Sequence, residues 1–469
     1  MPNGRIPVAL TSYQHRSLPI SAQRVVNWFA EQEPQDARSR MPLLPTPGLT
    51  RFATLASGPV RGAALMGSYL YVVSGTGVYR VDVAGASLFL GNIADGGPVS
   101  MANNGTQMAI VTPETQQGWV ATSTTVTQIT DATFLSFGAV YVTSLDGYGI
   151  FVKPNSTQFF ISNLKDMATY NALNLASAEA DPDNLILGSA VGRELWLVGE
   201  SSIEIWANTG AADFTFQRIS GAFIKRGTAA RNSFATIGST PFWLGENRVV
   251  YKGNGAGPPQ RISTHAIEQA IAGYSVASDA RGWTYEQEGH QFYGLTFPTE
   301  GDTWVWDDMT QLWHERESEG YFTYRLVDTQ TFAGATIGGD IRDGRLYIVD
   351  PEAYTEDGDA ILRSATGMTM QQSGLRIFNQ QLTLDVETGV GLTAGQGSDP
   401  QIWLQQSDDG GRTWSSEKWA DLGATGTYRT RVQFSRLGTS RQRVYRWGMS
   451  DPVRTTLMAM DLNATPGST

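Results

Sequence analysis

The sequence predicts an all-β protein, with a β-propeller of six or seven blades followed by a C-terminal β-sandwich. Three observations lead to this prediction. The 469 residues include 51 Gly together with 13 Trp, 17 Tyr and 19 Phe, a composition typical of short strands and tight turns. A unit of two apolar strands and a turn recurs every ~40–50 residues, as in propellers. After Arg363 this repeat stops, and a new series of short strands begins.

The repeated unit is an apolar strand, a turn and a second strand. Clear copies are "SYLYVVSGTGVYRVDV" at residues 68–83 and "ELWLVGESSIEIWANTG" at residues 194–210. Corresponding first-strand positions are separated by 39 to 54 residues: Leu70, Ala109, Ile150, Trp196, Trp243, Tyr293 and Tyr347. A period of this length with several strands per repeat predicts propeller blades. We therefore expect the propeller to occupy residues 56–364.

The two ends of the chain differ from the repeats. Residues 1–55 contain "RMPLLPTPGL", and proline cannot donate to the interior of a sheet, so we expect an extended N-terminal arm. The stretch "SAQRVVNWFAEQ" within it fits a helix or a strand equally well. Residues 365–469 contain short strands such as "QIWLQQS" and "RQRVYRWGM", which suit a β-sandwich of ~100 residues.

Several classes of site and location are not expected from the composition. The chain has no cysteine, which excludes disulfides and thiolate metal sites and fits synthesis in a reducing cytosol. Its first residues lack an apolar signal region, and no run of ~18 apolar residues predicts a membrane span. The four histidines, at 15, 265, 290 and 314, lack the spacing of a local zinc site, and no nucleotide-binding or nucleophile motif occurs. We therefore predict no catalytic residue, no metal and no cofactor.

Two acidic clusters and one aromatic cluster each allow two interpretations. The acidic clusters at residues 179–184 ("EADPDN") and 355–359 ("TEDGD") either bind calcium or cap turns. Neither matches the EF-hand order, so turn capping is favoured.

Trp304 and Trp306 share one face of a strand, and Trp313 lies on the partner strand. These aromatics either form core or line a groove for sugars, and core is favoured.

A short motif raises the question of glycan cleavage. "SDDGGRTW" at residues 407–414 matches S-x-D-x-G-x-T-W and resembles the Asp box of sialidases, formed here by Ser407, Asp409, Gly411, Thr413 and Trp414. "RIP" at residues 5–7 resembles their arginine motif. The Asp-box residues favour a tight hairpin through side-chain acceptance and glycine turning. The motif occurs once and outside the repeats, so we interpret it as a structural turn. A glycan-binding or sialidase-like propeller remains the alternative.

A second resemblance extends over nearly the whole chain. It rests on "RVVNWFAEQ", "LLPTPGLTRF" (43–52), "FFISNLKDMATYNALNLASAEADPDNLI" (159–186), "VGESSIEIWANTG" (198–210) and residues 429–453, in this order. These segments resemble the packaged-DNA stabilisation proteins, or tail hub and nozzle proteins, of short-tailed bacteriophages. The resemblance implies a non-enzymatic protein of the virion tail, assembled in the host cytoplasm. A receptor-binding tail fibre should instead show a trimeric fibrous repeat, and the sequence has none.

The same resemblance implies a set of partners. The expected assembly is a hexameric ring below the portal and adaptor proteins, in contact with a tail plug or needle and with tailspikes or fibres. Such a ring closes the head, retains the packaged DNA and conducts the DNA during ejection. No stable membrane insertion is expected.

A basic segment near the C-terminus is a candidate interface. Residues 429–446 contain six arginines and no acid. We expect a hairpin in which Arg429 and Arg431 share a face, as do Arg441 and Arg443. The charges either protect a sheet edge or dock onto an acidic patch of a neighbouring subunit or tail protein. The candidate interface residues are Arg429, Arg431, Arg441, Arg443 and Arg446.

The charge distribution bears on DNA. Residues 366–469 hold ten Lys+Arg and nine Asp+Glu, whereas residues 1–365 hold 24 and 36, a net charge of −12. Proteins that grip duplex DNA neutralise its phosphates with a basic face. We therefore expect DNA to pass through the ring without specific binding.

Overall fold

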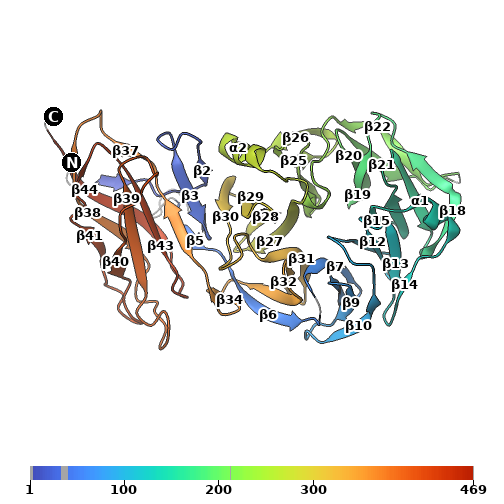
Figure 1. The fold of residues 1–469 in the computed structure, drawn as a ribbon, viewed down its shortest axis with the longest axis horizontal. Coiled ribbons are helices and arrows are strands. Elements are labelled where there is room, and N and C mark those ends of the chain that lie inside the picture. Colours follow the sequence, from blue (N-terminus) through green and yellow to red (C-terminus); the bar gives the residue numbers. More distant parts are fainter. Residues whose placement is uncertain (1–3, 33–40, 57, 212, 468–469) are drawn as a thin grey trace.

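The computed structural model describes residues 4–32, 41–56, 58–211 and 213–467. It confirms the predicted fold class, because the described residues form a β-propeller beside a β-sandwich (Figure 1). Helical structure in the described ranges is confined to α1 (Ala132–Phe137), α2 (His265–Gly273) and a single 3-10 turn (Arg231–Ser233). Asp131 caps α1 by accepting from the backbone N–H groups of Thr133 and Phe134, which satisfies donors that a helix start leaves open.

Four-stranded antiparallel units follow one another around the propeller. The first three blades are β7 (Val60–Met66), β8 (Tyr69–Ser74), β9 (Gly77–Val81) and β10 (Ser87–Asn92); β11 (Ser100–Asn103), β12 (Met108–Thr112), β13 (Gln117–Ala121) and β14 (Val126–Gln128); and β15 (Tyr141–Leu145), β16 (Tyr148–Val152), β17 (Gln158–Asn163) and β18 (Asp166–Ser177). The fourth and fifth are β19 (Leu185–Val191), β20 (Glu194–Gly199), β21 (Ile203–Asn208) and β22 (Phe216–Ile224); and β23 (Ala235–Ile237), β24 (Thr240–Leu244), β25 (Val250–Asn254) and β26 (Gly257–Arg261).

Two further four-stranded units belong to larger sheets. They are β27 (Arg281–Gln287), β28 (His290–Phe297), β29 (Asp302–Asp307) and β30 (Leu312–Glu315); and β31 (Leu326–Phe332), β32 (Ala335–Asp340), β33 (Arg345–Asp350) and β6 (Gly48–Thr54). The described residues thus form seven blades, within the predicted six or seven. The inner strand β31 of the last blade packs against β7 of the first, so the ring is closed.

A strand from the N-terminal segment completes the seventh blade. β6 pairs antiparallel with β33, with Tyr347 opposite Arg51 and Ile348 opposite Thr50. This pairing gives the last blade its fourth strand and joins the segment that enters the propeller to the segment that leaves it. The short hairpin of β34 (Thr355–Glu356) and β35 (Asp359–Ala360) extends the same sheet beyond β6.

Neighbouring blades are joined by hydrogen bonds between a side chain of one and the backbone of the next. Such a bond occurs at each of the seven junctions, because polar side chains on or near the inner strands reach the adjacent backbone. Going around the ring, the pairs are Asn103–Leu65, Ser100–Val142, Thr143–Ala190, Arg231–Ile186, Tyr293–Ser233, Thr329–Thr284 and Gln330–Ala63, at donor–acceptor distances of 2.6 to 3.2 Å. These bonds satisfy backbone groups that the packed inner strands would otherwise leave unpaired.

Aromatic side chains fill the spaces between blades. Trp306 lies opposite Trp313 in the register of β29 and β30, with ring centroids 5.4 Å apart. Both residues and Trp304 are buried in one apolar cluster of blades five and six. The three tryptophans are therefore core, and their burial does not support the sugar-groove interpretation.

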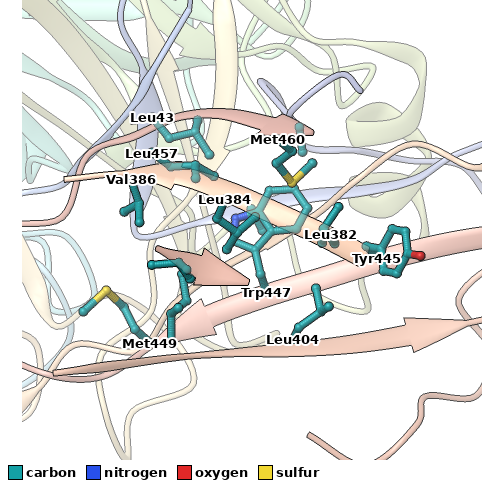
Figure 2. Packing of buried hydrophobic residues seen from close by; sticks show 14 of the residues in the cluster. Leu43, Leu382, Leu384, Val386, Leu404, Tyr445, Trp447, Met449, Leu457 and Met460 are labelled. Carbon is teal, nitrogen blue, oxygen red and sulfur yellow. The ribbon is translucent and has the colours of Figure 1, made fainter. Parts of the chain in front are cut away.

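The sandwich consists of two sheets that the N-terminal segment helps to build. The first contains β4 (Trp28–Ala30), β5 (Leu43–Pro45), β44 (Leu457–Pro466), β38 (Ile377–Val386) and β41 (Val432–Ser435), with β1 (Gly4–Ile6) on β44 and β42 (Thr439–Ser440) on β38. The second contains β36 (Arg363–Thr366), β43 (Gln442–Met449), β39 (Gln401–Ser407) and β40 (Lys418–Asp421), with β37 (Met370–Gln371) on β43. Figure 2 shows the apolar side chains of both sheets, such as Leu384 and Trp447, meeting between them.

One strand makes the second sandwich sheet continuous with a propeller blade. β3 (Ala22–Val26), which also pairs with β2 (Tyr13–Gln14), lies between β30 of blade six and β36 of the sandwich. Its pairing with β30 is parallel at Val26 and Glu315, and its pairing with β36 is antiparallel over three residues. Arg24 strengthens this joint by donating from Nε to Glu315 Oε2 at 3.0 Å. The sheet therefore runs without interruption from β27 to β40.

The N-terminal segment differs from the extended arm that the prolines suggested. Its described part forms β1 to β6, which pair with both sandwich sheets and with blades six and seven. The prolines fit because Pro45 ends β5 and Pro47 precedes β6, where a missing N–H group costs no interior ladder bond. The stretch 21–32, which fitted helix and strand equally, forms β3 and β4 and turns between them at Asn27.

Asn27 forms hydrogen bonds to several segments where the propeller and the sandwich meet. Its side chain is fully buried, and its Nδ2 donates to the carbonyl oxygens of Glu317 (3.0 Å) and Leu362 (2.9 Å). Its Oδ1 accepts from the Glu317 N–H at 3.2 Å. Its backbone has a φ of 56°, a left-handed conformation that Asn tolerates better than most residues. Asn27 thus links the N-terminal strands, the end of blade six and the linker into the sandwich.

We predict that Asn27→Ala lowers the free energy of unfolding by about 1–3 kcal/mol, because buried backbone groups lose their partners. The measurement is denaturant unfolding followed by tryptophan fluorescence. Asn155→Ala is the matched control, since Asn155 also has a left-handed φ, of 48°, but is exposed. Equal losses in the two variants would mean that backbone conformation, rather than the buried hydrogen bonds, sets the effect.

Candidate functional site

The Asp-box residues form a closed turn directly after β39. Asp409 Oδ1 accepts from the Ser407 hydroxyl at 2.7 Å and from the Arg412 and Thr413 N–H groups at 2.9 Å. Its Oδ2 accepts from the Thr413 hydroxyl at 2.6 Å. Hydrogen bonds from the side chain and backbone of Thr413 are the main cause that holds the pKa of Asp409 well below its usual range. Each oxygen of this carboxylate is therefore used inside the turn.

The two glycines of the turn allow it to pack against the N-terminal segment. Gly410 and Gly411 have φ values of 80° and 95°, and a Cβ on Gly410 would lie 3.2 Å from the backbone of Pro19. A Cβ on Gly411 would lie 3.1 Å from the Cβ of Ala22. Glycine suits both positions because side chains would disfavour this conformation and crowd the contact. The turn thus fastens the second sandwich sheet to the segment that leads into β3.

The two sialidase-like motifs lie outside the propeller. Arg5 is on β1 of the first sandwich sheet, where its Nε lies 3.6 Å from Asp461. The Asp-box turn follows β39 of the second sandwich sheet. Neither motif reaches the propeller axis, so they do not assemble a glycosidase site there.

The basic segment of residues 429–446 does not form the predicted hairpin. β41 pairs with β38 in the first sandwich sheet, whereas β43 pairs with β36 and β39 in the second. Arg429 and Arg431 precede β41 rather than lying on a strand, so strand alternation does not relate them. The segment crosses from one sheet to the other because Val432 and Phe434 on one side, and Tyr445 and Trp447 on the other, all enter the shared core.

Three of the five candidate interface arginines have partners inside the sandwich. Arg443 is buried and forms a two-pronged ion pair with Asp408, at 2.7 and 2.9 Å. Arg446 lies over the ring of Trp414 at 4.2 Å and donates from Nε to Gln405 at 3.0 Å. Arg441 donates to the Gly374 carbonyl at 2.8 Å. The expectation of an exposed docking role is wrong for Arg443, whose charge is balanced within its own domain.

Arg429 and Arg431 remain exposed and line a groove, which we call the arginine groove. It lies on the outer face of β38, β44 and the segment before β41, has a volume of about 870 Å³, and includes the exposed ring of Tyr428. Neither arginine side chain forms a hydrogen bond or an ion pair within the part of the chain that the structure describes. The sequence indicated these two arginines but not the groove. The other walls of the groove come from β38, more than 40 residues before Arg429, and from β44 near the end of the chain.

A polar cavity occupies the centre of the propeller. It has a volume of about 400 Å³ and is lined by inner strands of six blades, with hydroxyl and amide side chains such as Ser100, Asn232 and Thr284. A second hollow of about 650 Å³ shares Thr236, Thr284 and Thr331 with it and extends over blade seven. We call the second hollow the acidic groove, because Glu286 and Asp350 line it and no Lys, Arg or His of the described residues does. The sequence did not predict either hollow, because the lining residues come from strands of several blades that are far apart in the chain.

The acidic loops cap turns and pair with basic side chains. In the first loop, Asp183 accepts from the N–H groups of Glu200 (2.8 Å) and Ser201 (2.7 Å), and Asp181 pairs with Lys225. In the second, Asp359 lies 2.8 Å from Arg325 and Asp357 pairs with Arg51. Across the described ranges no group of three or more His, Cys, Asp or Glu is placed to hold a metal ion. Those ranges also contain no helix long and apolar enough to cross a membrane.

A buried histidine holds part of the N-terminal segment against blade six. His290 Nδ1 lies 2.7 Å from Asp307 Oδ2, and its Nε2 lies 2.8 Å from Glu31 Oε2. Burial alone would lower the pKa of His290, but hydrogen bonds to the two carboxylates outweigh it and raise the pKa to about 9. His314 nearby behaves oppositely, since burial and then the charge of Arg316 lower its pKa to about 3. His290 is thus a charged clasp at neutral pH, whereas His314 is neutral.

Comparisons with known proteins identify two family models. Residues 5–354 match the model described as Bacteriophage P22 Gp10, beta-propeller, and residues 363–465 match the one described as Bacteriophage P22 Gp10, beta-sandwich. No curated protein matches the chain.

Solved structures of low identity were also found. The designed protein Ika8 is 10% identical with a TM-score of 0.39, over 70% of this chain and 100% of that one. YCF48 from Cyanidioschyzon merolae is 11% identical with a TM-score of 0.42, over 65% and 99%. The extracellular domain of BT4673 from B. thetaiotaomicron is 10% identical with a TM-score of 0.44, over 86% of this chain and 58% of that one.

We predict that Asp409→Ala lowers the melting temperature of the protein, because the turn loses the acceptor of its hydroxyl and N–H donors. Asp409→Asn keeps one carbonyl acceptor and should lower it less. Wild type and both variants should release no fluorophore from a fluorogenic sialoside. Hydrolysis by the wild type that Arg5→Ala abolishes would contradict the structural interpretation of both motifs.

We predict that the stabilising effect of His290 is lost at alkaline pH. The pKa of His290 is raised from 6.5 to about 9, so its contribution is fully present below pH 6.5 and declines as the pH rises through 9. Urea unfolding should show a large difference between wild type and His290→Gln near pH ~6 and a smaller one near pH ~10. His265→Gln, at an exposed histidine, is the control. A difference that does not change with pH would refute the charged clasp.

Proposed function

The chain belongs to the bacteriophage P22 Gp10 family, a family of structural proteins of the phage tail, and from this premise we propose that it forms the hub or nozzle ring of a short tail. In this role it closes the head below the portal and adaptor, retains the packaged DNA and conducts it during ejection. The observation that carries the proposal is the match of both family models, in order, over propeller and sandwich.

The architecture supports this role. A closed propeller presents broad faces on a rigid frame, and here each blade junction carries its own side-chain hydrogen bond. The continuous sheet through β3 fixes the sandwich to blade six. A tail component under the pressure of packaged DNA benefits from such a two-domain body, because partners on both domains are then held at fixed positions.

The proposed assembly is a hexamer that contacts the portal and adaptor proteins, a tail plug or needle, and tailspikes or fibres. Identical copies in a ring need complementary surfaces on each chain, and the sandwich and the propeller offer different ones. The sialidase-like alternative loses its support, because Arg5 and the Asp box both lie in the sandwich.

The test is a phage in which this gene carries a nonsense mutation. We expect heads that fill with DNA but lose it before tails are completed, with DNA retention restored when the wild-type chain is supplied from a plasmid. Electron cryomicroscopy of wild-type particles should show the chain as a ring below the portal. Infectious, DNA-filled particles formed without the chain would overturn the proposal.

The charge of the chain predicts its behaviour toward DNA. The net charge is −11, so a ring of several copies repels phosphates and lets the duplex slide. We predict no measurable binding of the isolated protein to duplex DNA at physiological salt, assayed by fluorescence anisotropy. Binding in the low micromolar range that weakens steeply with added salt would reveal a basic face and contradict the passive conduit.

A further inference from the structure

We propose that the arginine groove of one copy binds the acidic groove of a second copy, which makes this pair of surfaces the contact between subunits. The proposal rests on the ring inferred above and adds the surfaces that build it. Two observations support the proposal. The sandwich and the propeller differ in net charge, and Arg429 and Arg431 in one groove and Glu286 and Asp350 in the other form no ion pair among the described residues.

The arginine groove presents two guanidinium groups to solvent. Arg429 and Arg431 are exposed, and the ring of Tyr428 beside them is 72% exposed. All three carboxylates that line the groove interact within the chain: Asp461 lies 3.6 Å from Arg5, Glu387 bonds Arg454 at 2.7 Å, and Asp385 also has a partner. An exposed tyrosine flanked by arginines is a composition enriched where proteins bind one another.

The acidic groove lies on the most negative part of the chain. Residues 281–364, which run from β27 of blade six through the hairpin of β34 and β35 to the start of β36, hold 17 Asp+Glu and six Lys+Arg, a net charge of −11. Glu286 is exposed at the rim, and Asp350 lines the same hollow after β33. Guanidinium groups pair with carboxylates through two parallel hydrogen bonds, so two arginines entering this groove would find acceptors there.

The two grooves lie on different domains, which sets the kind of assembly. β38, β41 and β44 of the arginine groove form the end of the molecule away from the propeller (Figure 1). The contact therefore joins the sandwich of one copy to the propeller of the next, a head-to-tail arrangement that forms a ring when its rotation closes. A second copy is the chosen occupant because each chain carries both halves of this charge pair.

The experiment uses full-length chains in sedimentation velocity at low salt. Wild type should assemble, whereas Arg429→Glu/Arg431→Glu should associate more than roughly tenfold more weakly, because like charges then meet. Glu286→Lys/Asp350→Lys should weaken association in the same way. An equimolar mixture of the two variants should assemble again. The native arginine groove of one variant then meets the native acidic groove of the other, and the two charge-reversed grooves also have opposite charges. Raising the salt should weaken all of these assemblies.

Two further variants control for folding and for total charge. Arg376→Glu/Arg436→Glu changes the sandwich by the same charge at exposed arginines outside the groove and should assemble as wild type does. Asp350 also caps a turn by accepting from the Glu352 N–H, so Glu286→Gln/Asp350→Asn, which retains acceptors there, should still weaken assembly.

Three results would overturn the contact: a wild type that stays monomeric, reversed variants that assemble normally, or a mixture that does not recover. The ring in virions is tested separately by imaging. A ring in wild-type virions together with normal assembly of the reversed variants would refute this contact and leave the proposed function standing.

Discussion

The pairing of β6 with β33 is the constraint on which the rest of the structure depends. Blade seven has only three strands from its own part of the chain, and its fourth, outer strand comes from the N-terminal segment. Once β6 is fixed in blade seven, β5 and β4 just before it lie in the first sandwich sheet, and β3 lies between blade six and the second sandwich sheet. The chain therefore begins in the sandwich, enters the propeller to close it, and returns to the sandwich. The propeller and the sandwich therefore share the N-terminal segment, and the position of its strands in one domain depends on their pairing in the other.

A buried ion pair holds the segment that leads from blade seven back to the sandwich. Arg325 is almost fully buried between Asp340, at 2.9 Å, and Asp359, at 2.8 Å. Its guanidinium also lies over the ring of Tyr321 at 4.5 Å. A buried cation that is paired this way is costly to separate from its partners. Because Asp359 belongs to β35 and Asp340 to β32, the pairing holds the linker hairpin against blade seven in one position.

Sequence reasoning succeeded where local patterns determine structure. The recurrence of apolar strands predicted the blades, the tryptophans of residues 304–313 were correctly assigned to the core, and the Asp box was correctly interpreted as a turn, because each depends on neighbours along the chain. It failed where distant segments decide. The prolines of residues 41–50 hid strands that pair with residues hundreds of positions away. The arginines of residues 429–446 suggested one hairpin, although their apolar neighbours enter the core from two sheets. The arginine groove and the acidic groove could not be predicted, since no single segment contains either.

The shared strands also determine when the fold can be completed. Tyr347 pairs with Arg51 and Leu462 pairs with Gly4. The first strands of the chain therefore cannot pair until residues several hundred positions later have been synthesised. Closing such long loops has an entropic cost before any contact rewards it. During synthesis blades one to five can form in turn from local contacts, while β1 and β6 stay without their partners. Ring closure and domain docking thus become the final, coupled step of folding, and a ribosome that stops short leaves an open chain with unpaired edges rather than a smaller stable protein.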